Sequence, residues 1–286
     1  MTNDYSQKQI FITKSSGEIE PFSEVKLRRS LERVHASANI IEEIIQHVQR
    51  ELRPGMTTSQ IYRHAFSLLR KKNRALAGRY SLKQAIRELG PSGHPFEKLI
   101  GELLIFEGFS VEVGKVVQGS CVRHEIDVIA QKDNQHIMVE CKFHNQPGVK
   151  SDVKVSLYVH ARFLDVEKAW QKNSQHGEKF HEAWLVTNTK LTSDAIRYAE
   201  CVRMKPIGWS YPREQSLEAR IDRSGLHPVT CLTTLSHIQK RQLIENGIVL
   251  CKELVDKKNI LPSFGFKETK IAIIMNEALQ LCNKNS

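Results

Sequence analysis

The stretch His124-Glu-Ile-Asp-Val-Ile-Ala130, followed by Ile137-Met-Val-Glu-Cys-Lys-Phe143, decides the fold of this chain. Both segments carry runs of apolar residues, which predicts two short buried strands. The polar residues between them predict a turn, so the two strands form a hairpin. Residues two apart in a strand point to the same face. Glu140 and Lys142 therefore share a face that Asp127 can reach from the neighbouring strand.

Two carboxylates and an ammonium group on this otherwise apolar hairpin are costly to remove from water. A metal ion that faces a phosphate group explains why such residues are placed there. The alternative is a buried salt bridge without catalysis, but buried ion pairs contribute little stability and apolar residues often replace them. The hairpin therefore predicts metal-dependent phosphate chemistry, with a structural ion pair as the competing interpretation.

The bulk composition is typical of a soluble globular protein. The chain has 286 residues, enough for two or three domains, with 40% hydrophobic and 26% charged residues. No apolar run approaches a membrane span, and the start of the sequence lacks the apolar segment of a signal peptide. The six cysteines are scattered without a C-x-x-C motif. We therefore expect reduced thiols in a cytoplasmic protein without a membrane partner.

The positive charge is unevenly distributed along the chain. The formal net charge is +10, of which residues 1–92 carry +7, residues 93–212 carry none and residues 213–286 carry +3. The segment that contains the hairpin is therefore neutral, and the basic excess lies on either side of it. Basic flanking regions favour anions such as nucleotide phosphates or nucleic acid. A merely solvated basic surface is the competing interpretation for the N-terminal part.

The order of predicted elements indicates three regions in a chain of the α/β (α+β) class. Residues 8–90 contain two short strands around a Gly turn and then four helices, which predicts a β-hairpin beside a small helical bundle. After the breaker-rich linker 90–95, residues 94–212 follow the order helix, three strands, helix, strand, helix, strand. This order is typical of a mixed-sheet α/β unit. Residues 213–286 are predicted to be helical.

Capping residues predict where the helices of the first region begin. Ser23 is expected to cap the first helix, and Thr58 or Ser59 the third. A fourth helix is expected to cover about Arg74 to Leu89.

With its surroundings, the hairpin resembles the core of the PD-(D/E)XK nuclease superfamily, and most closely its branch of Mrr-type restriction enzymes and archaeal Holliday-junction resolvases. In that branch a helix bearing Glu precedes a Gly-aromatic pair and two strands that bear Asp and Glu-x-Lys. This chain has the corresponding motifs in the same order: Phe96-Glu97, Gly108-Phe109, Glu125-Ile-Asp127 and Glu140-Cys-Lys142. A later strand and helix at 184–195 extend the resemblance over about residues 94–210.

The resemblance implies an endonuclease that hydrolyses DNA phosphodiester bonds with magnesium. Asp127 and Glu140 would bind Mg²⁺, a hard cation that prefers oxygen ligands, and the backbone carbonyl of Cys141 would be a further ligand. The cation would act as a Lewis acid and lower the pKa of its water. Lys142 would hold the attacking water and the phosphate oxygens, and Glu97 would complete the site.

Other polar residues near the motif are weaker candidates. Glu102 lies on the same predicted helix as Glu97, but about 140° around it. His124 and His144 flank the motif, either as phosphate contacts or as ordinary surface histidines. Cys141 points away from the metal-binding face and is expected in the core rather than as a nucleophile.

The first region resembles the ATP cone, the nucleotide-sensing domain of ribonucleotide reductases and of the repressor of their genes. The resemblance rests on Ile12-Thr-Lys14-Ser-Ser-Gly17, Glu20-Pro-Phe22, Lys26-Leu27, Gly55-Met-Thr-Thr58 and Arg79-Tyr80. It implies ATP or dATP as a regulatory ligand, with phosphates on Lys14 and Lys26 and the base or sugar near Glu20 and Thr58. The pair Ser15-Ser16 replaces the family's Arg-Asp. One basic contact is therefore missing, and a cone kept only for packing or dimerisation is the alternative.

The C-terminal region, residues 213–286, loosely resembles tandem helix-hairpin-helix units, which bind DNA phosphates without reading sequence. A helical cap or a dimer contact is the alternative for this region. The sequence as a whole predicts a homo-oligomeric DNA endonuclease under nucleotide control. Two other interpretations stay open: a DNA-binding or assembly protein with a vestigial nuclease core, and a structure-specific junction resolvase.

Overall fold

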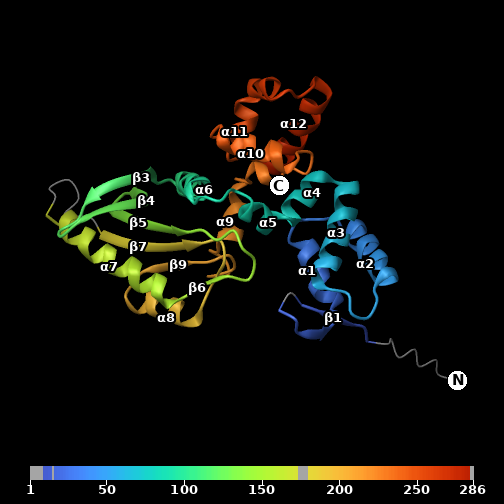
Figure 1. Ribbon diagram of the computed structural model, residues 1–286, viewed down its shortest axis with the longest axis horizontal. Helices are drawn as coiled ribbons and strands as arrows, with labels where there is room; N and C mark the ends of the chain where they lie inside the picture. The colour runs from blue at the N-terminus through green and yellow to red at the C-terminus, as the bar shows by residue number, and fades with distance from the viewer. Residues whose placement is uncertain (1–8, 15, 173–179, 284–286) are drawn as a thin grey trace. The chain divides into compact units, whose positions relative to one another are not determined.

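A computed structural model describes residues 9–14, 16–172 and 180–283 (Figure 1). The chain divides into two compact units, of which the first is formed mainly by residues 1–82 and the second by residues 83–230 and 235–284. Helices, an N-terminal hairpin and a mixed sheet together give the mixed α/β class that the sequence predicts.

The first unit is a β-hairpin followed by a helical bundle. Strands β1 (Phe11–Thr13) and β2 (Ile19–Pro21) pair antiparallel, with Glu20 opposite Ile12. The helices that follow are α1 (Glu24–Glu32), α2 (Ala38–Glu51), α3 (Thr58–Lys72) and α4 (Arg74–Tyr80). Their apolar stripes meet in one core, which includes Leu31, Ile44, Ile45, Ala65 and Leu69. The spacing of these residues at three and four positions is what predicted the helices.

Side-chain caps decide where these helices begin. The Ser23 side chain accepts a hydrogen bond from a backbone N–H in the first turn of α1, as predicted. The prediction for α3 was wrong by one residue, because its cap is Thr57, which forms a capping box with Gln60. The predicted fourth helix is also divided in two. After α4 the chain passes through Ser81 and continues as α5 (Leu82–Arg87).

The second unit contains a five-stranded sheet in the order β3-β4-β5-β7-β9. Its strands are β3 (Ser110–Gln118), β4 (Arg123–Lys132), β5 (Gln135–Lys142), β7 (Phe180–Thr187) and β9 (Lys205–Ile207). The first three strands are antiparallel, whereas β5, β7 and β9 run parallel. Parallel neighbours need crossover connections, and helices α7 (Val153–Trp170) and α8 (Ser193–Cys201) supply them. The short strands β6 (Lys150–Ser151) and β8 (Lys190–Leu191) form a separate parallel pair.

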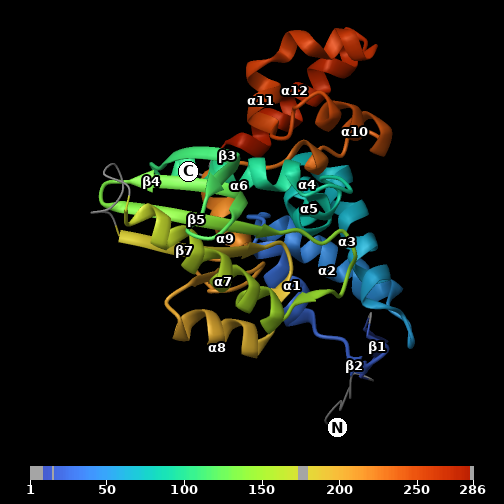
Figure 2. The same ribbon diagram turned by 60° about the vertical axis from the view of Figure 1, so that its left-hand side comes forward.

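Helices cover both faces of this sheet (Figures 1 and 2). One face packs against α7 and α8 in a core that includes Met138, Leu185 and Val159. The other face is covered by α6 (His94–Phe106), which carries the buried Phe96. The central strands β4, β5 and β7 therefore carry runs of buried residues, whereas the edge strand β3 alternates in exposure.

Two glycines fix how α6 meets the sheet. The helix approaches β3 closely at Gly101, where a Cβ atom would lie 3.0 Å from Cγ2 of Val113. It ends before Gly108, whose φ of 91° is in the left-handed region that favours glycine. The backbone N–H of Phe109 then donates to the carbonyl of Leu104 and closes the helix. The start of the sheet is thus set relative to the helix that carries Glu97.

The part of the chain that follows the sheet is helical, as predicted. It comprises α9 (Leu217–Ser224), η1 (Val229–Cys231), α10 (His237–Glu245), α11 (Cys251–Asp256), η2 (Lys258–Phe264) and α12 (Glu268–Cys282). Glycines with positive φ, Gly247 and Gly265, follow α10 and η2. Among the residues described, no helix combines the length and the apolar character needed to cross a bilayer.

Candidate active site

Asp127 lies on β4 at a point where the pairing of the strand is interrupted. Its neighbour Val128 pairs with β3 and β5, but Asp127 itself pairs with neither strand. The residue in register on β3 is Gly114, which has a φ of 65°. The Asp127 carboxylate instead accepts a 2.7 Å hydrogen bond from the backbone N–H of Cys141. This contact fixes Asp127 against the segment of β5 that carries Glu140.

Glu140 is held by an arginine that lies outside the sequence motif. Its carboxylate forms an ion pair with Arg162 of α7, and the two side chains are only 16% and 12% exposed. Arg162 also donates to the backbone carbonyl of Glu125, so the guanidinium bridges β4 and β5. Glu140 is in register with Leu185 of β7, a core residue of the face that α7 covers. The crossover helix therefore brings this cation to the site.

The pKa values of three carboxyl groups near the ends of these elements are raised by their surroundings. Burial, and then the negative charge of Asp127, raises the pKa of Glu140 to about 7, while Arg162 opposes the rise. Burial also raises the pKa of Asp127 itself, against the hydrogen bond from Cys141. The pKa of Glu97 is raised by its burial and by Asp127. Each of the three groups therefore ionises less readily than an exposed carboxyl group, and a cation bound between them would relieve this cost.

Glu97 lies in the first turn of α6, close enough to Asp127 for the charge of that carboxylate to raise its pKa. Its carboxylate is 3.4 Å from Nδ1 of His94. The preceding residue, Phe96, is fully buried, and its ring centroid lies 5.6 Å from that of Phe143 on the segment after β5. This packing fastens the start of α6 to the end of β5. The influence of Asp127 on its pKa favours Glu97 over Glu102 as the acidic residue of this helix.

The end of β5 carries Cys141 and Lys142 in two different environments. Lys142 is exposed, and its charge opposes the burial that raises the pKa of Glu140. Cys141 is buried, and burial together with the charge of Asp127 raises the pKa of its thiol well above the usual value. A thiol in this state is a poor nucleophile. The environments agree with a core position for Cys141 and a solvent-facing position for Lys142.

Both histidines beside the motif have structural partners. His124 Nε2 lies 2.8 Å from the carboxylate of Asp165 on α7. The backbone of His144 forms two hydrogen bonds with the Asn188 side chain, of 2.9 Å and 2.8 Å. His144 Nε2 also lies 3.2 Å from Oγ of Ser151. These contacts favour the structural interpretation of both residues over phosphate contact.

The position of Arg162 within its helix could have indicated from the sequence that this residue has a buried partner. The apolar stripe of α7 includes Val159, Phe163 and Val166, which are buried against the sheet. Arg162 is three residues after Val159 and four before Val166, so it lies within this stripe. A charged residue in an apolar stripe indicates a buried partner. The identity of the partner, Glu140, depends on how α7 crosses the sheet.

The residues predicted to bind nucleotide form a charged cluster in the first unit. Nζ of Lys14 and Nζ of Lys26 lie 2.9 Å and 3.0 Å from the same carboxylate oxygen of Glu20. Hydrogen bonds from Lys14 and then Lys26 lower the pKa of Glu20. Glu18 also forms a 3.0 Å ion pair with Lys14, so the charges of the two lysines and the two glutamates cancel. Glu20 lies between the two ammonium groups and holds them close to each other. The sequence predicts that one basic contact is lost where Ser15-Ser16 replaces the Arg-Asp of the family. Ser15 lies outside the described residues.

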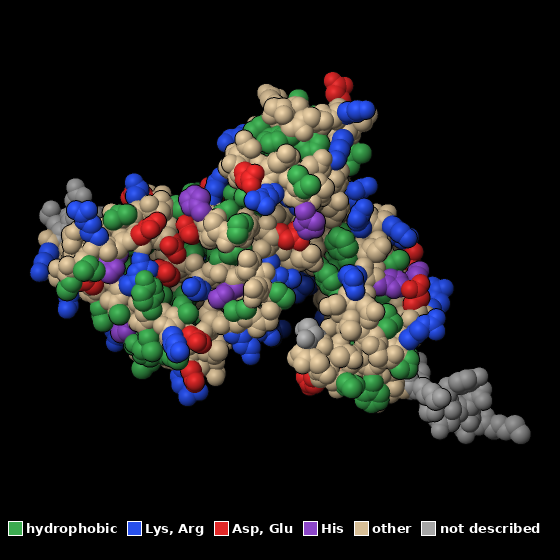
Figure 3. Space-filling view, viewed as in Figure 1, with side chains coloured by type: hydrophobic (Ala, Val, Ile, Leu, Met, Phe, Trp, Pro, Cys, Tyr) green, Lys and Arg blue, Asp and Glu red, His purple; other side chains and the backbone are tan. Residues whose placement is uncertain are grey.

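The predicted residue Thr58 is brought beside this hairpin by backbone contacts. The N–H of Thr13 donates to the carbonyl of Met56 at 2.9 Å, and Thr13 bridges to Thr57. Thr58 is the first residue of α3, where backbone N–H groups favour an anion. Lys and Arg side chains also gather along the edge formed by α2 and α3 (Figure 3). Part of the predicted basic surface thus lies on this unit.

Comparison with protein families divides the chain into three matching segments. Residues 10–89 match the ATP cone domain, and residues 89–207 match a restriction endonuclease family. Residues 227–282 match the C-terminal domain described as AF1548-like. The two N-terminal matches confirm the resemblances inferred from the sequence motifs.

Two relatives span about two thirds of this chain. An uncharacterized protein of Archaeoglobus fulgidus is 38% identical over 180 residues, which are 63% of this chain and 97% of that protein. A solved structure titled as a protein of unknown function, AF1548, is 36% identical with a TM-score of 0.54. It covers 67% of this chain and 98% of its own length.

Proposed function

The chain belongs to the AF1548 family and joins an ATP cone to a restriction endonuclease domain, and from this premise we propose that it is a magnesium-dependent DNA endonuclease controlled by ATP or dATP. The main support is the group of partly buried acids Glu97, Asp127 and Glu140, with Lys142 beside them, inside the segment that matches the endonuclease family. Buried ion pairs contribute little to stability, so a structural role alone is a weak explanation of these charges.

The acidic residues fit a hard divalent cation. Asp127 and Glu140 would hold Mg²⁺ through carboxylate oxygens, and the Cys141 carbonyl would be a further ligand. When bound, the cation would supply Lewis acidity to the phosphate and acidify a water molecule. Lys142 would donate hydrogen bonds to the non-bridging oxygens and orient the attacking water. Glu97, which keeps its proton more firmly than an exposed acid, would hold a second water or complete the ligand set.

Arg162 would have two roles in this scheme. Before the cation binds, the guanidinium neutralises Glu140 and holds it in place. Once Glu140 contacts the cation, Arg162 would be able to turn to the phosphate of the substrate, because guanidinium groups bind phosphate well.

The proposal is tested by incubating the full-length chain with supercoiled plasmid and with branched DNA, in Mg²⁺ and in a chelator. Linear or nicked products that need Mg²⁺ would support endonuclease activity. Cleavage confined to branched DNA would select the junction resolvase instead. DNA binding without cleavage on either substrate would favour the binding protein with a vestigial core, in which the Glu140–Arg162 pair is only structural.

Cleavage is expected to increase as the pH rises from about 6 to about 8, because Glu140 must lose its proton to bind the cation. Its pKa of about 7 lies above its usual value of 4.5. The folded state thus retains this proton longer than the unfolded state. Glu140 therefore lowers the stability of the metal-free protein as the pH rises from about 4.5 to about 7.

Rate measurements against pH at fixed Mg²⁺ check this expectation with a pair of variants. Arg162→Gln removes the charge that lowers the pKa of Glu140, so the rate profile should move to higher pH. Arg197→Gln removes an arginine of α8 that is 79% exposed, and its profile should match the wild type. A flat wild-type profile, or equal shifts in the two variants, would contradict the role of Glu140.

Nucleotide binding to the cone is expected to depend on the ammonium groups near Glu20. Lys26→Ala should weaken ATP or dATP binding by roughly tenfold, since a charge-assisted phosphate contact contributes about 1.5 kcal/mol. Lys71→Ala, an exposed lysine of α3 in the same unit, should bind as the wild type does. Isothermal titration calorimetry on the full-length chain measures both. Equal affinities would indicate that Lys26 does not contact the nucleotide.

Control by the nucleotide would act through the oligomeric state or through access to DNA. Reciprocity requires that DNA change the affinity for nucleotide by the same factor as nucleotide changes the affinity for DNA. Light scattering and cleavage assays with and without ATP and dATP test this part separately. Identical mass and rate under all conditions would leave the cone as a packing module and would not affect the nuclease proposal.

A further inference from the structure

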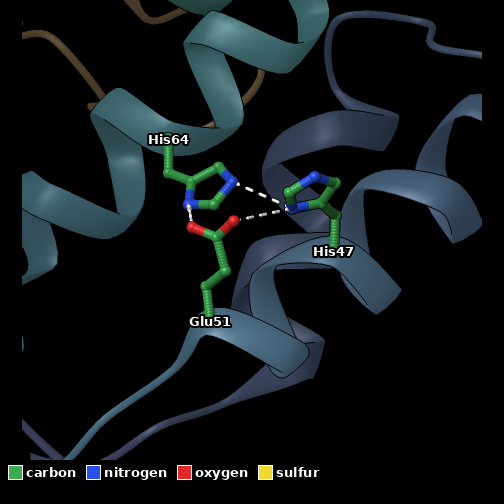
Figure 4. Close-up of side chains that lie close together, drawn as sticks. All are labelled: His47, Glu51 and His64. Atoms are coloured by element: carbon green, nitrogen blue, oxygen red, sulfur yellow. Dashed lines mark hydrogen bonds and ion pairs between the residues drawn. The ribbon is translucent and has the colours of Figure 1, made fainter.

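His47, Glu51 and His64 form a cluster of potential metal ligands that the predicted nuclease and nucleotide sites do not use. His47 and Glu51 are one turn apart on α2, and His64 lies on α3, which packs against it. Figure 4 shows the three side chains pointing toward one another. Within the described part of the chain, no other group of three His, Cys, Asp or Glu residues has all its ligand atoms within 4.8 Å of one another.

Two of the three distances between these ligand atoms are close to those of a tetrahedral coordination shell, and the third lies within 4.8 Å. Nε2 of His64 is 3.1 Å from Nδ1 of His47, and Oε1 of Glu51 is 3.5 Å from the same Nδ1. Around zinc, with metal–nitrogen bonds of about 2.0–2.1 Å, two tetrahedral ligand atoms lie about 3.3 Å apart. One ion can therefore reach both imidazoles and the carboxylate with small side-chain movements.

We propose that His47, Glu51 and His64 bind one divalent transition-metal ion, with zinc as the best match. Two imidazole nitrogens and one carboxylate suit zinc, whereas magnesium prefers a shell of oxygen ligands. Three protein ligands leave a fourth position for water. Oε2 of Glu51 lies 3.1 Å from Nδ1 of His64. A proton on that nitrogen leaves the Nε2 lone pair to face the ion, so Glu51 also orients the ring.

The cluster is preorganised and open to solvent. The side chains of His47, Glu51 and His64 are 40%, 56% and 17% exposed, so an ion can enter from solution. Without an ion, a chain of hydrogen bonds from His47 through His64 to Glu51 keeps the same atoms together. Metal binding therefore requires little rearrangement of the two helices.

The ion would join α2 to α3 at the end of the α2–α3 hairpin. Glu51 is the last residue of α2, and the connection that follows leads into Thr58 at the start of α3. An ion that binds only the folded arrangement stabilises it by mass action. The ion would then hold α2 and α3 of the first unit together, beside the segment predicted to bind nucleotide.

The test is zinc binding by the full-length, metal-free chain, measured by equilibrium dialysis against a zinc buffer. The wild type should bind one more equivalent than His64→Gln, and the affinity at this site should fall at least about 100-fold in His64→Gln and Glu51→Gln. Glu43→Gln is the matched control. It breaks the 2.7 Å ion pair with Lys72 between the same two helices but removes no ligand, so zinc binding should be unchanged. Equal stoichiometry and affinity in wild type and His64→Gln would overturn the proposal.

Cobalt substitution identifies the ligands without relying on His64, which is the least exposed of the three. The wild type loaded with Co²⁺ should show the visible bands of nitrogen and oxygen ligation, and His47→Gln should lose them. A thiolate-to-cobalt charge-transfer band that persists in His47→Gln would place the ion on cysteines and overturn the proposal. Neither measurement involves cleavage, so its outcome is separate from that of the nuclease proposal.

Discussion

Replacing Asp127 by asparagine is expected to reduce Mg²⁺-dependent DNA cleavage by at least about 10³-fold. Loss of one preorganised electrostatic group at a reacting centre costs about 10²–10³-fold, and Asp127 is also predicted to hold the cation. Asparagine keeps an oxygen that can accept the hydrogen bond from the Cys141 N–H. The fold of the hairpin should therefore be retained while the charge is lost. Lys142→Ala should reduce the rate by about 10²–10³-fold, because the phosphate loses its cationic partner.

Glu102→Gln is the matched control for these variants. Glu102 lies on α6, as Glu97 does, but outside the set of acids that influence one another. The cleavage rate of Glu102→Gln should stay within a few-fold of the wild-type rate, whereas Glu97→Gln should cleave DNA more slowly. Single-turnover plasmid cleavage separates the chemical step from DNA binding, which filter binding in Ca²⁺ measures. Wild-type rates in both Asp127→Asn and Lys142→Ala would refute the assigned site.

Truncation of Phe96 to alanine is expected to destabilise the second unit by about 3–5 kcal/mol. The side chain is 0% exposed and packs on Phe143, one residue after Lys142. The variant leaves a cavity between α6 and the sheet and removes the contact that fastens Glu97 near Asp127. The fraction that remains folded should therefore cleave more slowly than the wild type.

Urea unfolding followed by tryptophan fluorescence measures this change. The three tryptophans, Trp170, Trp184 and Trp209, all belong to the second unit, so their signal reports its unfolding. Phe106→Ala is the matched control, since Phe106 lies on the same helix and is 43% exposed. The loss of stability in Phe106→Ala should be small compared with the loss in Phe96→Ala. Equal midpoints for the two variants would contradict the packing of α6 against the sheet.

Sequence reasoning predicted the parts of the site that depend on local geometry. Strand alternation is fixed by the backbone, so the positions of Glu140 and Lys142 relative to the buried residues followed from the order of amino acids. The helix before Gly108 followed from apolar spacing and from a residue that tolerates positive φ. The caps and breaks of the first unit were less accurate, as Thr57 and Ser81 illustrate, because several nearby residues compete to end a helix.

The sequence by itself determined the class of the chain, the hairpin that carries Asp127 and Glu140, and the helix that carries Glu97. Each depends on residues close together in the chain, whose spacing the backbone converts directly into geometry. Only the tertiary structure decided that Arg162 holds Glu140, that Glu20 joins two lysines, and that His47 and Glu51 meet His64. Those contacts depend on how helices cross a sheet or one another. The packing of whole apolar faces sets the angle at which these elements cross, and the local spacing of residues does not encode that angle.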